Sequence, residues 1–234
     1  MKKFALSLAC CAAVALAAEG DFKTHTEFSY IQTKGNTDTK SLGLDFKGQK
    51  EVDLHRFMLD AEAFYAENDG EETKNYFLIE GNYFYKLTDR TEFNYLIGYR
   101  DDKFSGYDYQ FYTGPGIYHK LFEDAKQTLF VGANLLYSID EYENGDSEDY
   151  FSGRADLDYE YRFNENVKFV EEADYRVRFD DTDTWFFNSK SSLYSKLSDA
   201  LSLGLSYKIN YQNNPPADKK KTDTAVLVSL VVDW

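Results

Sequence analysis

Hydrophobic and polar residues alternate along most of the chain after residue 20. In the stretch ALSLGLSYKINYQ, apolar side chains take every second position from Leu201 to Tyr211, and small or polar residues fill the places between them. Successive side chains of a β-strand point to opposite faces, so a period of two predicts strands with one apolar and one polar face. About twelve such runs predict twelve strands: 21–33, 37–50, 55–66, 73–87, 91–103, 107–121, 127–140, 149–163, 167–180, 184–197, 200–212 and 222–234.

The connections between these runs alternate in length. VDLH, LTDR, FNEN and LSDA are tight turns, whereas ENDGEET, DKFSGYD, DEYENGDSED, DDTDT and NNPPADKKK are more polar and generally longer. Short turns at one end and longer loops at the other are typical of up-and-down barrels in the outer membrane. No linker or shift in composition divides the runs, so we expect a single barrel domain over residues 18–234.

The apolar face decides between two classes of β-protein. A closed sheet of about twelve strands is too wide for side chains to fill from within, so an apolar interior would be an empty cavity. The same side chains facing lipid need no filling, and a closed barrel leaves no backbone edge unpaired. Aromatic residues make up 18% of the chain and gather near strand ends, as in the girdles of membrane barrels. We therefore predict an all-β, up-and-down antiparallel transmembrane β-barrel; a soluble β-barrel or sandwich that binds a ligand is the alternative.

The first residues have the pattern of a secretory signal peptide. Lys2 and Lys3 precede an apolar run, and Ala15-Leu16-Ala17 is a small-x-small cleavage site, which predicts a cleaved segment over 1–17. Cys10 and Cys11 lie inside it, so the remaining chain would form no disulfide; a lipid anchor on one of them is the alternative. Cleavage leaves 24 of the 26 basic residues against 41 acidic ones, a net charge of −17, which argues against nucleic acid as a partner. No later run of about 18 apolar residues predicts a membrane-spanning helix.

Three segments carry a family resemblance. QTKGNTDTKSLGLDFKGQ, RTEFNYLIGYRDDKFSGYDYQFYTGPGIYHKLFED and LSDALSLGLSYKINYQNNPP resemble the salt-induced outer-membrane proteins (YdiY-like), a family defined by a domain of unknown function. The resemblance covers almost the whole chain after the signal peptide. It implies a barrel in the cell outer membrane of a Gram-negative bacterium, and no catalytic or ligand-binding residue.

The last strand, TAVLVSLVVDW, is predicted to face lipid on alternate positions up to its final aromatic residue. Val228, Leu230, Val232 and Trp234 also resemble the assembly signal of outer-membrane proteins. The resemblance implies that the barrel-assembly machinery is a partner. Outer-membrane lipid and lipopolysaccharide are the other expected partners. The basic DKKK at Asp218–Lys221 is expected to be a solvated loop tip, and contact with lipopolysaccharide phosphate is the alternative.

The polar faces carry mixed charge and supply the candidate lumen-lining residues. Mixed charge can line a water-filled pore or brace a closed lumen through salt bridges, and both alternatives stay open. In an open pore, the acidic excess favours small cations among the solutes. By parity Glu171 falls on the lipid face, which predicts a bulge there or a misplaced strand, whereas Asp45, Lys47, Asp60 and Glu62 point inward. The predicted lumen-lining residues are Arg100, Arg154, Asp156, Asp158, Glu160, Arg162, Glu172, Asp174, Arg176 and Arg178.

Two remaining features concern local structure and catalysis. Pro115 lacks an N–H group and fits poorly in a paired strand, so Gly114, Pro115 and Gly116 predict a bulge or kink. His25, His55 and His119 have no triad-like neighbours, and the acidic loops lack the spacing of a calcium loop, so we expect no catalytic residue, cofactor or metal. The sequence favours a narrow diffusion channel or a structural envelope protein linked to salt or osmotic stress; a lipid-modifying enzyme of the outer membrane is the alternative.

Overall fold

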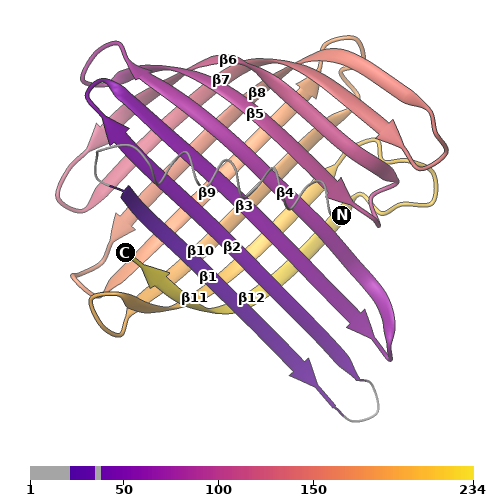
Figure 1. Ribbon diagram of the computed structural model, residues 1–234, viewed down its shortest axis with the longest axis horizontal. Coiled ribbons are helices and arrows are strands. Elements are labelled where there is room, and N and C mark those ends of the chain that lie inside the picture. Colours follow the sequence, from indigo (N-terminus) through magenta and orange to yellow (C-terminus); the bar gives the residue numbers. More distant parts are fainter. Residues whose placement is uncertain (1–21, 35–37) are drawn as a thin grey trace.

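Twelve antiparallel strands close into one barrel in a computed structural model that describes residues 22–34 and 38–234 (Figure 1). Each strand pairs with its neighbours in sequence, and β1 closes the ring with β12. The predicted signal peptide and its two cysteines lie outside the described residues. No helix of the described residues is long and apolar enough to cross a membrane. The strands are β1 (Phe22–Thr33), β2 (Thr39–Val52), β3 (His55–Asn68), β4 (Glu71–Lys86), β5 (Thr91–Asp102), β6 (Tyr107–Glu123), β7 (Gln127–Tyr142), β8 (Ser147–Arg162), β9 (Val167–Arg178), β10 (Trp185–Lys196), β11 (Leu201–Gln212) and β12 (Thr222–Asp233).

All twelve predicted strands are confirmed, and no strand end differs from its predicted position by more than two residues; one such difference is at ENDGEET. There we expected a loop, but β3 and β4 continue to a two-residue turn at Asp69 and Gly70, whose φ angles are 50° and 82°. Two successive residues with positive φ make a tight turn whose twist matches that of a hairpin. The β3–β4 hairpin is therefore longer than the alternation alone suggested.

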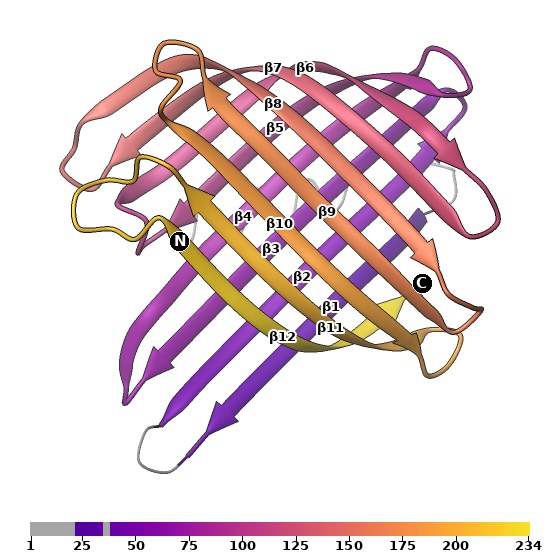
Figure 2. The same ribbon diagram turned by 180° about the vertical axis from the view of Figure 1, so that it is seen from behind.

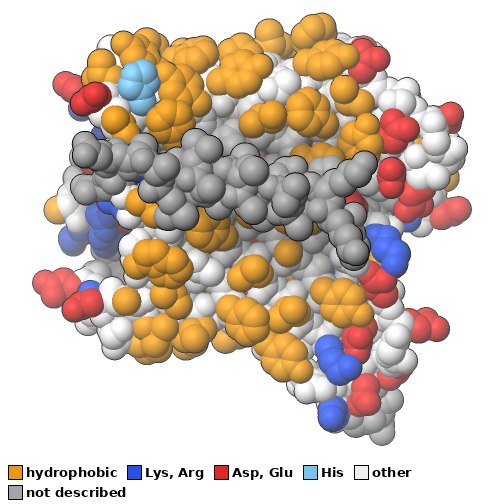
Figure 3. Space-filling view, viewed as in Figure 1, with side chains coloured by type: hydrophobic (Ala, Val, Ile, Leu, Met, Phe, Trp, Pro, Cys, Tyr) orange, Lys and Arg blue, Asp and Glu red, His pale blue; other side chains and the backbone are white. Residues whose placement is uncertain are grey.

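The barrel is apolar outside and polar inside. Among the described residues, the buried set contains 19 polar or charged residues and 11 hydrophobic ones, the reverse of a soluble core. Large apolar side chains such as Phe28, Leu44, Ile97, Leu135 and Val226 are instead 46–56% exposed on the outer wall. On the face that Figure 3 shows, hydrophobic side chains form a broad band between two ends that carry the charged residues. This distribution is the one expected of a wall in contact with lipid.

The two ends of the barrel differ. We call the end that holds residue 22 and Trp234 the terminal end; its turns are residues 53–54, 87–90, 124–126, 163–166 and 197–200. The opposite, loop end has its longest connection at residues 213–221, between β11 and β12.

The seam between β1 and β12 is short. In the described residues these strands pair at five positions, from His25 opposite Asp233 to Ser29 opposite Ser229, whereas every other neighbouring pair of strands holds ten or more. Towards the loop end β1 and β12 separate (Figure 2). Backbone pairing therefore closes the barrel mainly at its terminal end.

Candidate functional site

The polar strand faces enclose a central cavity of about 520 Å³, which is the candidate functional site. It extends from Arg56 and Arg162, near the terminal end, to Asn188 and Asn210 in the loop-side half of the barrel. Eight of the ten predicted lumen-lining residues line it: Arg100, Arg154, Asp156, Asp158, Glu160, Arg162, Glu172 and Asp174.

The other two predicted residues lie on inward-facing positions but pack against rings instead of lining this cavity. The Arg176 guanidinium is 4.4 Å from the ring centre of Phe186, and that of Arg178 is 4.0 Å from the ring centre of Tyr150. Arg178 also donates two hydrogen bonds to Asp180, at 2.8 and 3.1 Å, in the loop after β9. These bonds hold the pKa of the Asp180 carboxyl below its usual range.

Ion pairs cross the lumen from wall to wall. Arg154 of β8 donates to Glu80 of β4 at 2.6 Å. Lys47 of β2 pairs with Glu172 of β9, and Lys208 of β11 pairs with Glu62 of β3. Because each pair joins strands that are not neighbours in the sheet, these side chains narrow the interior.

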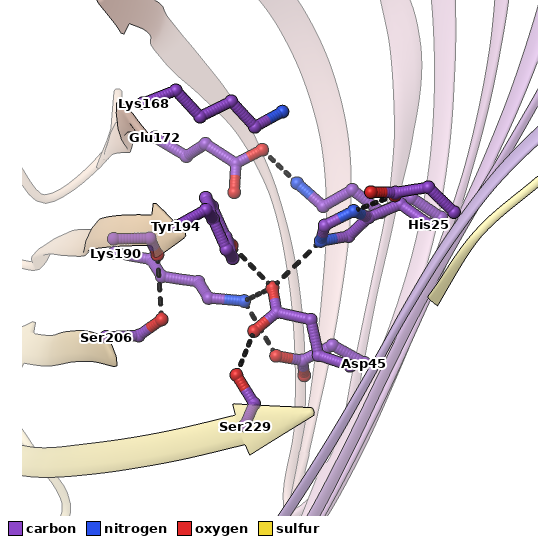
Figure 4. A network of polar contacts seen from close by, with 12 residues as sticks. His25, Asp45, Lys168, Glu172, Lys190, Tyr194, Ser206 and Ser229 are labelled. Carbon is purple, nitrogen blue, oxygen red and sulfur yellow. Dashed lines mark hydrogen bonds and ion pairs between the residues drawn. The ribbon is translucent and has the colours of Figure 1, made fainter. Parts of the chain in front are cut away.

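A second network lies inside the barrel at the seam (Figure 4). Glu27 of β1 is 3% exposed and accepts hydrogen bonds from Lys190 and Tyr194 of β10, both at 2.6 Å, and from Ser229 of β12 at 2.9 Å. His25 Nδ1 lies 2.6 Å from an Asp233 carboxylate oxygen on the other side of the seam. Sequence analysis missed this network; parity places Glu27 and Lys190 on polar faces, but only the register and the curvature of the barrel bring them together.

The lumen narrows between the central cavity and a smaller one of about 70 Å³ at the loop end. Arg100, Asn188 and Asn210 line both cavities, and we call these three residues the neck. Arg100 stands on β5, while the two asparagines are register partners on β10 and β11, on the far side of the barrel.

The loop of residues 213–221, with Lys219, Lys220 and Lys221 lining the smaller cavity, crosses the mouth above the neck. Its Pro216 packs against Gly106 of the β5–β6 loop so closely that a Cβ on the glycine would lie 2.8 Å away. At the base of the loop, Gln212 Nε2 donates to the Tyr107 hydroxyl at 2.5 Å. The β11–β12 loop thus reaches the opposite rim and covers the mouth.

Glu171 lies on the outer wall, and neither explanation offered from the sequence is right. The register of β9 with β8 and with β10 continues through Glu171 without a bulge, and the strand is where we predicted it. Ser189 Oγ of β10 donates to one carboxylate oxygen at 2.6 Å, and Ser191 Oγ donates to the other. The outward charge is therefore satisfied by two hydroxyl groups from the neighbouring strand.

The register of β6 with β7 is the same on both sides of Gly114–Gly116, and its two shifts lie elsewhere, between Tyr107 and Tyr109 and between Lys120 and Phe122. A Cβ on Gly114 would lie only 1.9 Å from the Leu135 carbonyl oxygen, so the glycine permits a close approach of β7. A kink at this segment stays a prediction.

The remaining predicted residues lie near the terminal end. Val228 and Leu230 are exposed on the outer wall, and Trp234 exchanges two backbone hydrogen bonds with Thr24. In the described part of the chain, no histidine shares a hydrogen bond with a serine; His55 contacts the Tyr83 hydroxyl. The same residues contain no group of three or more His, Cys, Asp or Glu side chains placed to hold a metal ion.

Comparison with known proteins gives a family and several distant folds. The family model described as "Protein of unknown function, DUF481" matches residues 26–234. No curated protein matches. Among solved structures, the chain is similar to the NanC porin (13% identity, 91% of this chain and 98% of that chain covered, TM-score 0.48). It is also similar to the KdgM porin in complex with disordered oligogalacturonate (9%, 90% and 98%, 0.45) and to the translocator domain of autotransporter NalP from Neisseria meningitidis (8%, 100% and 95%, 0.46).

Proposed function

The chain belongs to the DUF481 family of proteins of unknown function, and we propose from its barrel that it spans the outer membrane and forms a narrow passage for small polar solutes, with a preference for cations. One observation carries the proposal: a charged cavity of about 520 Å³ lies inside a closed wall whose outer face is apolar. Lipid can surround such a wall while water fills the cavity.

The inside of the barrel supports a small passage. Wall-to-wall ion pairs such as Arg154–Glu80 cross the cavity, the neck narrows it, and residues 213–221 cover its mouth. Charged rings and constrictions of this kind discriminate between solutes by size and sign. We therefore expect small single-channel conductance with long closed periods.

Planar-bilayer recording of the purified protein tests the passage. Replacing residues 215–220 with a two-residue Gly-Ser link removes the part of the loop that lies over the mouth. Arg100→Ala widens the neck. Each change should raise the conductance above that of the unaltered protein. Shortening the exposed terminal-end turn at residues 197–200 by one residue serves as a control and should leave conductance unchanged. The absence of current in all these proteins would refute the passage.

The wall-to-wall ion pairs also favour a second candidate, a structural envelope protein with a closed lumen. That protein would conduct no ions with either the intact or the shortened loop, yet its loss would weaken the envelope. Bile-salt sensitivity of a strain that lacks the gene, with rescue by the non-conducting protein, would support this function.

The location and physiological role belong to the same proposal. The apolar band supports insertion in the outer membrane of a Gram-negative bacterium after removal of residues 1–17, with lipid and lipopolysaccharide around it. We propose that the assembly machinery reads Val228, Leu230, Val232 and Trp234, and that the protein is used under salt or osmotic stress. Outer-membrane fractionation tests the location, and growth of a deletion strain at high salt tests the role under stress. Fatty-acid release that depends on His25, His55 or His119 would instead indicate a lipid-modifying enzyme.

A further inference from the structure

Two carboxylates of the central cavity lack an ion pair. Within the described residues, all seven cationic side chains that line the cavity are paired with a carboxylate, including Lys47 with Glu172 and Lys190 with Asp45. Of the nine carboxylates that line it, seven are in ion pairs, three of them with the same Arg154. The remaining two, Asp60 of β3 and Asp158 of β8, form no ion pair.

The register places these carboxylates at one level of the lumen. Asp60 is directly opposite Lys47 on β2, and Asp158 is directly opposite Glu172 on β9. Directly opposite residues of antiparallel strands share a face, and Lys47 and Glu172 themselves meet across the lumen. These four side chains, three carboxylates and the Lys47 ammonium group, therefore lie at one level, where Lys190, opposite Glu172 on β10, is paired with Glu27 and Asp45.

Buried oxygen atoms at this level also lack partners. Asp60 Oδ1 and Asp156 Oδ2 have no hydrogen-bond donor among the described residues. Asp156 is 8% exposed, lines the same cavity and lies two residues before Asp158 on the inward face of β8. A buried carboxylate oxygen without a donor is unfavourable, so this wall favours an occupant that brings positive charge.

We infer that the cavity holds a binding site for a hydrated monovalent cation between Asp60 and Asp158, a site that deepens the proposed function and rests on it. The described residues include no set of three or more ligands arranged to coordinate a metal ion, which argues against a tightly held divalent ion. A cavity of about 520 Å³ leaves room for an ion that keeps its water. The ion sits beside the Lys47–Glu172 bridge, where the two free carboxylates compensate its charge.

The site makes Asp60 and Asp158 the residues that favour cations over anions in the passage. Carboxylates next to the path of an ion attract cations and repel anions, and a low-dielectric wall strengthens this effect. Replacing both with asparagine preserves side-chain size and removes no ion pair. We therefore expect the Asp60→Asn/Asp158→Asn variant to fold, which heat-dependent gel mobility checks.

Sodium-23 NMR of the protein in detergent micelles tests binding without requiring conduction. The unaltered protein should broaden the sodium line, and the double variant should reduce the broadening at least about fivefold, with each single variant in between. Asp146→Asn, in the exposed β7–β8 turn, is the matched control and should leave the broadening unchanged. Equal broadening by the double variant and the control would overturn the site.

Reversal potentials in a tenfold KCl gradient then connect the site to the passage. The unaltered protein should favour potassium over chloride, and the double variant should lose that preference at least about fivefold. If the protein binds sodium through Asp60 and Asp158 but passes no current, the passage fails and the site stands. If it conducts with the same selectivity in both forms, the passage stands and the site fails.

Discussion

Removal of the two serine hydroxyl groups that hold Glu171 should destabilise the barrel. Ser189 and Ser191 each donate to one oxygen of this outward-facing carboxylate. A hydrogen bond to a charged group contributes about 1.5–3 kcal/mol, so Ser189→Ala combined with Ser191→Ala should lower the free energy of unfolding by about 3 kcal/mol. Glu171 lies between Phe169 and Tyr175 on the apolar wall, where water cannot easily replace the lost donors.

Denaturant titration in lipid vesicles measures this loss, with the fluorescence of Trp185 and Trp234 reporting the folded barrel. The serine substitutions repeated in a Glu171→Leu background complete a double-mutant cycle, because without the carboxylate there is no charge left to satisfy. In that background the same two changes should alter stability by less than about 0.5 kcal/mol. Ser195→Ala, at an exposed outward position of β10, serves as a control for the loss of a hydroxyl group.

The reasoning fails if the serine substitutions have the same effect with and without the carboxylate. That result would mean that Ser189 and Ser191 act through packing or strand propensity alone. An unfolding free energy that rises when both serines are replaced, with Glu171 in place, would also contradict it.

Three further predictions concern the seam, its network and the close approach of β6 to β7. Extending the observed register of β1 and β12 by one pair brings Tyr30 opposite Val228. If the bilayer draws the seam shut, Tyr30→Cys with Val228→Cys should form a disulfide on oxidation and raise the free energy of unfolding by about 2–4 kcal/mol. A non-reducing gel without a cross-link would show that the strands stay apart. Glu27→Gln removes the buried charge shared by three donors and should lower the unfolding free energy by about 3 kcal/mol or more, measured by the same titration. Gly114→Ala sets a Cβ against the Leu135 carbonyl oxygen and should reduce the yield of folded barrel on a heat-modifiability gel, whereas normal folding would show that the strands can move apart.

The strands and their two faces could be predicted from the sequence because alternation is a local property. Each run carries its own period of two, so the inward direction of Asp60 and the outward direction of Glu171 follow without knowledge of the fold. The partners of these residues could not be predicted. Ser189 becomes the donor to Glu171 only through the register of β10 on β9, which hydrophobic pattern alone does not fix.

The network around Glu27 at the seam was harder still to predict, because it depends on the curvature of the barrel as well as on strand register. Glu27 and Lys190 are 163 positions apart and meet because twelve strands bend into a ring. The tight turn at Asp69-Gly70 is different. Asp-Gly is a strong local hairpin signal, and the acidic residues around it made the segment resemble a loop.

The ion pairs that narrow the lumen also join the two walls beside the open part of the seam. Lys208 of β11 reaches Glu62 of β3, and Lys74 of β4 bonds Asp223 of β12 at 2.8 Å. Both pairs connect the last strands with the first ones, across the region where β1 and β12 no longer share backbone bonds. A change that widens the passage by removing such a pair therefore also removes a link across the seam. Substitutions that break these pairs should consequently raise conductance and lower barrel stability. The ion pair of the neck residue Arg100 is with Asp102 of its own strand, so substitution of Arg100 should change conductance alone.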